Sequence, residues 1–175
     1  VGGRGREATS AGWKWADAGR GTGVRPGQAV TYTGTCENTG GADGGVGYDD
    51  VIEGVRDDAT ITAAPAAAEP ALTVAPITNG RFSVDGTLAA GQTVTVSYTA
   101  TVNPNGERGD NVLGNFVVPG GEEPPAECVD GSTLCTVHPV PQLEITKTSD
   151  SDENTRVGDT VEYTVTATNV GGLAY

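Results

Sequence analysis

Several residue types are scarce or missing in this sequence, and each scarcity excludes a class of function. There is no methionine and only one histidine, His138, which lies in the proline-containing segment HPVP. A histidine in such a segment is a poor general base for a nucleophile, and without further ligands nearby it cannot build a zinc site. No apolar run approaches the roughly 20 residues that span a bilayer. We therefore expect no enzyme activity, no required cofactor and no direct membrane insertion.

Basic residues are also few. Ten Lys and Arg stand against 23 Asp and Glu, which gives a formal net charge of −13. Nucleic-acid binding requires a basic face that neutralises phosphates. An acidic chain is repelled by anionic membrane surfaces as well, and its charge favours solubility. We therefore expect no nucleic-acid partner.

Sustained helical periodicity is missing too. The Ala-rich stretch 63–71 contains prolines, which break a helix. The sequence is instead rich in Thr and Val, which favour strands, and in Gly and Pro, which mark turns. Seven or more short alternating segments predict an all-β fold, an antiparallel β-sandwich. The expected strands lie near 12–16, 28–38, 46–52, 71–75, 81–84, 92–103, 111–118, 143–148 and 159–169.

The only two lysines, Lys14 and Lys147, occupy the same place in a sequence unit that occurs twice. Gly27–Gly41 aligns without gaps onto Gly158–Gly172, and 8 of these 15 positions are identical. Self-similarity at a fixed spacing is typical of modular, string-like proteins. The lysines are 133 residues apart, which gives the module length.

This spacing predicts three regions. They are a flexible N-terminal segment (1–11), a complete module (12–141) and the first two strands of a second module (142–175). The opening residues, VGGRGREATS, lack the apolar core of a signal peptide. Because the chain has no initiator methionine and stops within the second copy, we expect a segment of a longer protein that carries the export and anchoring signals.

The three cysteines indicate the compartment. Cys128 and Cys135 flank six residues, VDGSTL, which contain the turn dipeptide Asp-Gly. A hairpin there would bring two strands and their sulfurs together, which predicts a disulfide and an oxidising, extracellular setting. Cys36 aligns with Ala167 of the second copy, and we expect it to be a small buried thiol.

Three polar residues fall where strand alternation predicts core. Lys147 follows Leu143 and Ile145 in phase, so its counterpart Lys14 is expected on an inward face. Asp50 shares a face with Val46, Tyr48 and Ile52, and Asn115 shares one with Leu113 and Val117. A buried charge is costly unless it is paired. The pattern therefore predicts that Lys14, Asp50 and Asn115 meet.

This trio suits an intramolecular isopeptide bond. Burial disfavours the charged forms of both the amine and the acid. A neutral Lys14 is therefore expected to attack the Asn115 carbonyl, while a protonated Asp50 polarises that carbonyl and shuttles protons. Asp49 is the alternative acid. The structural alternative is a lysine that extends to the rim, an aspartate in a turn and an asparagine bonded to a strand edge.

The stretches GTLAAGQTVTVSYTATVNPNGERGD and NFVVPGGEEPPAECVDGSTLCTVHPVPQLEITKTSD resemble the DUF11-type repeat of large surface proteins of high-GC Gram-positive bacteria. The resemblance covers nearly everything from Trp13 onward. It implies an Ig-like sandwich that occurs in tandem arrays of exported, wall-attached proteins and is not an enzyme. It also implies an isopeptide trio at Lys14, Asp50 and Asn115.

The expected function is a structural stalk or fibre repeat of an adhesin-like cell-surface protein, with neighbouring modules of the same protein as partners. One alternative is an extracellular filament subunit that assembles by strand exchange through 142–175, whose strand edges are unpaired. Another is a ligand-binding adhesin tip. The acidic stretch 149–159 lacks the spacing of an EF-hand loop, so a solvated loop is preferred to a calcium site.

Overall fold

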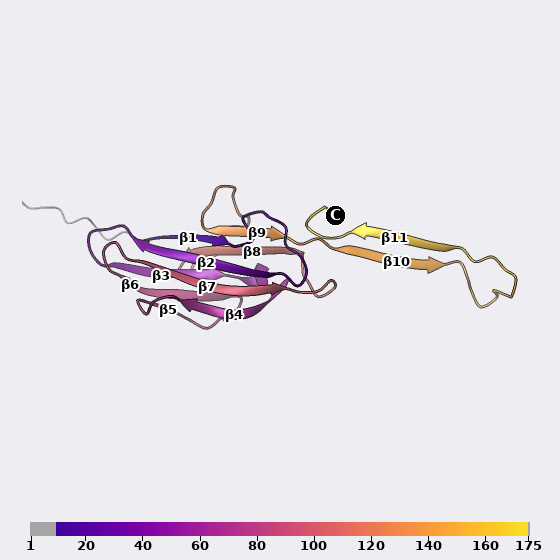
Figure 1. The fold of residues 1–175 in the computed structure, drawn as a ribbon, viewed down its shortest axis with the longest axis horizontal. Helices are drawn as coiled ribbons and strands as arrows, with labels where there is room; N and C mark the ends of the chain where they lie inside the picture. Colours follow the sequence, from indigo (N-terminus) through magenta and orange to yellow (C-terminus); the bar gives the residue numbers. More distant parts are fainter. Residues whose placement is uncertain (1–9, 175) are drawn as a thin grey trace, which may run out of the picture.

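The computed structural model describes residues 10–174, and side chains from Ala16 onward. Nearly all regular structure is strand, and the predicted all-β antiparallel sandwich is confirmed (Figure 1). The elements are β1 Ser10–Ala16, β2 Ala29–Asn38, β3 Gly44–Val51, α1 Glu53–Arg56, β4 Ala59–Ala67, β5 Leu72–Val74, β6 Arg81–Leu88, β7 Thr93–Val102, β8 Val112–Pro119, β9 Cys135–Pro139, β10 Leu143–Ser149 and β11 Tyr163–Asn169.

Two sheets form the sandwich. One contains four strands in the order β1-β2-β7-β4, and the other contains five in the order β5-β6-β3-β8-β9. Every pair within the sheets is antiparallel. The strands β1 and β8, far apart in sequence, therefore lie in facing sheets (Figure 1).

Strand alternation builds the core. On β2, Val30 and Tyr32 are fully buried, and on β7 every second residue from Val94 to Val102 is buried. β2 and β7 are neighbours, with Tyr32 opposite Tyr98 in the register. Inward residues of period two are what a half-buried strand requires, so the core of this sheet follows directly from the sequence.

Two elements were not expected. β4 includes part of the Ala-rich stretch and contains Pro65, yet it forms the outer strand of the four-stranded sheet. An edge strand tolerates proline because its outward N–H groups need no ladder partner, and register shifts after Ile61 and Ala63 accommodate the irregularity. The short helix α1 was also not predicted. Ser10 and Ala11, assigned to the N-terminal segment, belong to β1.

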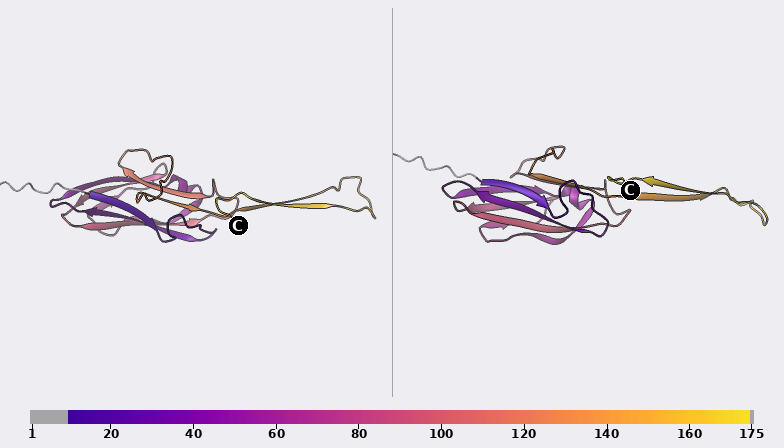
Figure 2. Two further views of the ribbon diagram at one scale, coloured as in Figure 1. Left: turned by 90° about the horizontal axis from the view of Figure 1, so that it is seen from above. Right: turned by 45° about the horizontal axis from the view of Figure 1, so that its top comes forward.

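The β10–β11 hairpin forms a separate two-stranded sheet that projects from one end of the sandwich (Figure 2). Its assignment to a second module stays a prediction. Ile145, Tyr163 and Val165 on it are each at least 60% exposed. Among the described residues, no helix is long and apolar enough to cross a membrane.

Candidate functional site

The centre of the sandwich contains a buried amide–carboxylate pair. Asn115 of β8 is fully buried and Asp50 of β3 nearly so. Asn115 Nδ2 donates to Asp50 Oδ1 at 2.6 Å, and also approaches the Val51 carbonyl at 3.2 Å and Tyr98 Oη at 3.0 Å. Asn115 Oδ1 accepts no hydrogen bond from any described residue. Asp50 therefore contacts the amide nitrogen of Asn115, and the expectation that it polarises the carbonyl oxygen is wrong.

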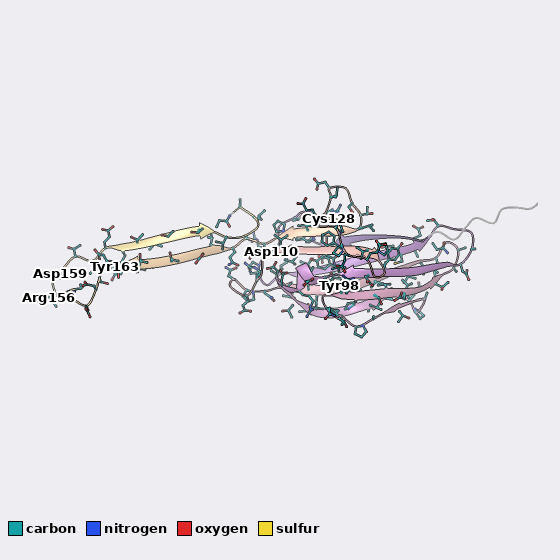
Figure 3. All side chains as sticks on the ribbon, turned by 180° about the vertical axis from the view of Figure 1, so that it is seen from behind. Tyr98, Asp110, Cys128, Arg156, Asp159 and Tyr163 are labelled. Carbon is teal, nitrogen blue, oxygen red and sulfur yellow. A yellow bond between two sulfur atoms is a disulfide. The ribbon has the colours of Figure 1, made fainter. Side chains whose placement is uncertain are left out.

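Aromatic rings surround the pair. Tyr98 stacks on Tyr32 with centroids 4.9 Å apart and meets the edge of Phe82 at 5.7 Å. Burial raises the pKa of Tyr98 well above its ordinary value, and the nearby charge of Asp50 raises it further. Burial and the charge of Asp50 also raise the pKa of Tyr32. Both phenols therefore stay protonated, and the pair lies in a buried, low-dielectric environment (Tyr98 is labelled in Figure 3).

The neighbouring acid, Asp49, is bonded differently. Its Oδ2 accepts from Arg81 Nη1 at 3.4 Å and from the Gly121 amide at 3.0 Å. Successive residues of a strand point to opposite faces, which separates the environments of Asp49 and Asp50. The acid beside Asn115 is thus Asp50.

Lys14 is described only through its backbone, since its side chain lies outside the described residues. On β1 it pairs with Gly34 of β2. Gly34 and Asp50 line the same small cavity between the sheets, together with Cys36, Tyr48, Val84, Val96 and Val117. The residue that pairs with Lys14 therefore lines the same cavity as Asp50.

Lys147, the counterpart of Lys14, has a different environment. Its Nζ lies 4.4 Å from the ring centroid of Tyr163, in a cation–π contact on the exposed hairpin. Lys147 pairs with Val165 in the hairpin register.

A disulfide joins Cys128 to Cys135, with Cα atoms 5.7 Å apart. The expected hairpin between them is wrong: Cys128 lies in the loop after β8, and only Cys135 belongs to a strand, which pairs with β8. Arg20 was not predicted to matter here. Its guanidinium donates to the Cys135 carbonyl and lies 3.4 Å from Cys128 Sγ. Cys36 is buried, and burial raises the pKa of its thiol.

His138, in the proline-containing segment HPVP, lies in a strand rather than in a linker. It belongs to β9, is fully buried, and its Nδ1 lies 3.1 Å from the Thr22 carbonyl. Burial lowers its pKa. It packs edge-on against Tyr32 at 6.0 Å, so it is a core residue.

Carboxylates gather at one end of the sandwich. Ligand atoms of Asp57, Asp58 and Asp110 lie within 4.8 Å of one another (Asp110 is labelled in Figure 3). The buried Asp58 accepts hydrogen bonds from the Asn111 and Val112 amides, at 3.1 and 2.9 Å. These bonds give it a structural role, and exposed acidic neighbours are common without an ion, so no metal site is assigned.

The acidic loop 149–159 uses its carboxylates to bind its own backbone. Asp152 accepts from the Asn154 amide at 2.9 Å, Asp159 from the Arg156 amide at 2.8 Å and Asp150 from the Glu162 amide at 2.9 Å. The first bond forms an Asx-type turn, and the bond between Asp150 and Glu162 joins the two ends of the loop.

Comparisons with known proteins give a family. No curated protein matches the sequence significantly. One similar solved structure is the major pilin SpaA of Corynebacterium diphtheriae, described as pointing to a modular pilus assembly with stabilizing isopeptide bonds. The identity is 16%, the TM-score is 0.38, and the match covers 82% of this chain but only 40% of that pilin. The DUF11-type label stays a prediction. The profile of a domain of unknown function, DUF7927, matches residues 10–140, and the chain belongs to this family.

Proposed function

We propose that this chain is a structural stalk or fibre repeat of an exported bacterial cell-surface protein, clamped by an isopeptide bond between Lys14 and Asn115. The observation that carries the proposal is the buried Asn115–Asp50 pair, whose 2.6 Å hydrogen bond points the amide nitrogen at the acid. Two further observations support it: no described residue donates to Asn115 Oδ1, and Gly34, which pairs with Lys14, lines the same cavity as Asp50.

The chemistry follows from this arrangement. The neutral Lys14 amine forms a bond from Nζ to Asn115 Cγ, and the Cγ–Nδ2 bond breaks. Asp50 lies beside the leaving nitrogen and relays to it the proton that Nζ loses. One ammonia leaves, so atoms and charges balance. A neutral amine is the nucleophilic form of lysine, and the burial of Asn115 and Asp50 strengthens electrostatic interactions at the site.

The bond has a mechanical consequence. β1 is the first strand of the sandwich, and β8 is followed only by β9 before the hairpin. A covalent link between Lys14 and Asn115 would transmit a pulling force on the two ends of the domain directly from β1 to β8. Strands β2 to β7 would then bear no load. The Cys128–Cys135 disulfide shortens the part of the chain after Asn115 that could still extend under force.

The rest of the proposal concerns setting and partners. A disulfide persists in oxidising compartments, which supports an extracellular location at the cell surface or cell wall. The partners are neighbouring modules of the same protein, and self-assembly into fibres belongs to this role. The adhesin-like role of the parent protein is part of the proposal, and the crosslinking is a single self-modification rather than enzyme turnover.

Peptide mapping tests the clamp. Trypsin cannot cleave after a modified Lys14, so the crosslink joins peptide 7–20 to peptide 109–147. Lys147 is the internal control, because in this chain it lies against Tyr163 and should be cleaved normally. Recovery of peptides 7–14 and 109–147 as separate linear species would contradict the proposal.

A second candidate is a filament subunit assembled by strand exchange. The observation that favours it is the hairpin face formed by Ile145, Tyr163 and Val165, whose exposures are 67%, 60% and 62%. Sedimentation over a range of concentrations separates the two roles. Growing polymers that disappear in an Ile145→Lys, Val165→Lys variant support strand exchange, and a monomer at every concentration excludes it for this chain.

A further inference from the structure

The two copies of the repeat share more than sequence. In the first, Ser10 pairs with Asn38 and Lys14 with Gly34. In the second, Leu143 pairs with Asn169 and Lys147 with Val165. Along each strand of the second hairpin, every residue lies a constant number of positions after its counterpart in the first hairpin. All seven residue pairs of the two registers therefore correspond. The hairpins are therefore the same structural unit.

The turn after each hairpin is also the same. Asn38 Nδ2 donates to the Ala42 carbonyl at 2.8 Å, and Asn38 Oδ1 accepts from the Gly40 amide at 2.9 Å. Asn169 makes both bonds at the equivalent positions, to Leu173 and Gly171, at 3.0 and 3.1 Å. A side chain that binds its own backbone in this way fixes the turn, so Asn38–Asp43 and Asn169–Ala174 share one conformation.

The second turn is docked on the sandwich. The Gly172 amide donates to the Val140 carbonyl at 3.0 Å, and Asn111 Nδ2 donates to the Val170 carbonyl at 3.3 Å. A side chain at Gly172 would lie 2.9 Å from the Asn111 carbonyl, so only glycine permits this approach. Leu173 lies against Gly23.

Arg108 fixes the linker beneath the same turn. Its Nη2 donates to the Pro141 carbonyl at 3.2 Å and to Gln142 Oε1 at 2.8 Å. The docking surface therefore consists of the loops at one end of the sandwich, around residues 20–26, 108–111 and 139–142.

The first turn presents the same features to solvent. Thr39, Gly41, Ala42 and Asp43 are exposed, and the glycine pair of the second turn recurs as Gly40–Gly41. Asp43 stands at the position of Ala174, which lines one depression with Arg25. An aspartate there would face the Arg25 of a partner, which adds charge complementarity.

We infer that the Asn38–Asp43 turn is a docking surface for a preceding copy of this domain, which presents its loops 20–26, 108–111 and 139–142 and pairs its Arg25 with Asp43. The inference rests on the proposed role as a tandem repeat and adds to it a defined head-to-tail contact. Successive modules would then be held at a fixed angle rather than joined by a loose linker.

The test uses a chain in which residues 10–142 precede a further copy of 10–175, so that Gln142 is followed by Ser10 as it is by Leu143 here. Cys36 is replaced by Ala in both copies. Gly23→Cys in the first copy is combined with Ala42→Cys in the second, and oxidative crosslinking is timed. Gly23→Cys with Leu173→Cys in the existing chain calibrates the rate. In the control, Ala90→Cys replaces Gly23→Cys in the first copy and is combined with the same Ala42→Cys. Ala90 lies beside Asn38, at the opposite end of the sandwich from Gly23.

We expect the 23–42 pair to crosslink about tenfold faster than the control pair, and equal rates would overturn the inference. In the same chain, Arg25→Asp in the first copy should slow crosslinking about two- to fivefold, and adding Asp43→Arg in the second copy should restore it. No response to either change would contradict the assigned ion pair. Crosslinking rates do not depend on loss of ammonia, so failure of the isopeptide proposal is distinguishable from failure of this one.

Discussion

Asn115 Nδ2 donates a 2.6 Å hydrogen bond to Asp50 Oδ1 between the two sheets of the sandwich. The two residues lie on neighbouring strands, β8 and β3, and Tyr98 of the opposite sheet contacts the same nitrogen. Among the described side chains, none donates to Asn115 Oδ1, which is unusual for a buried amide oxygen. The proposed amide exchange rests on this arrangement.

The two adjacent aspartates provide a matched pair of variants. We expect Asp50→Asn to abolish crosslinking of Lys14 to Asn115, because no acid is then left beside the leaving nitrogen. Asp49→Asn should leave crosslinking intact, since Asp49 bonds Arg81 and Gly121. Intact mass measures the crosslinked fraction, and circular dichroism checks that both variants fold. Crosslinking of Asp50→Asn at the wild-type rate would remove Asp50 from the mechanism.

Stretching single molecules tests the mechanical role. The wild-type domain should not release the residues between 14 and 115, because the covalent bond bypasses them. Asn115→Ala should release roughly 350 Å more contour length, at about 3.5 Å per residue. Lys14→Arg should give the same increase, since a guanidinium does not act as the nucleophile. Equal contour lengths in all three chains would show that no clamp exists.

The disulfide should contribute separately. Cys128→Ser with Cys135→Ser should lower the unfolding free energy by about 2 kcal/mol, because a short closed loop is freed in the unfolded chain. Urea unfolding followed by tryptophan fluorescence measures this. Cys36→Ala, which leaves the disulfide intact, is the control. A double variant as stable as wild type would show that the loop contributes nothing to stability.

Asp57 should make stability depend on pH. Partial desolvation of its carboxylate, and then the charges of Asp58 and Asp110, raise the pKa of Asp57 from 3.8 to about 6. A raised folded-state pKa means that folding takes up a proton at Asp57 between these values. The contribution of Asp57 to stability is therefore greatest below about pH 4 and falls as the pH rises to 6. Asp57→Asn should therefore unfold at a higher urea concentration than wild type at pH 7.5, and at the same concentration near pH 3.5. A stabilisation independent of pH would point to another cause.

The sequence predicted the fold where alternation is undisturbed. The inward residues of β2 and β7, and the burial of Asp50 and Asn115, follow from period-two patterns that packing then enforces. The prediction from sequence failed where tertiary contacts override local secondary-structure preference. β4 is a strand despite Pro65, because it occupies an edge, and His138 is buried because β9 completes a sheet with β8.

Other features needed three-dimensional information. The contact of Arg20 with the disulfide spans more than 100 residues of sequence, and no local pattern signals it. The α1 helix is a single turn, too short to show a period. The docking of the second turn depends on close backbone approach at Gly172, which appears in the sequence only as a repeated glycine pair.

The most direct test of the central claim is the intact mass of the purified chain under non-reducing and reducing conditions. The account predicts a mass lower than that of the sequence by one ammonia under both conditions, with a further loss of two hydrogens that reduction reverses. A reduced mass equal to that of the unmodified sequence would contradict the clamp. Lys14 would then be an ordinary strand residue, and the Asn115–Asp50 pair a structural hydrogen bond in the core.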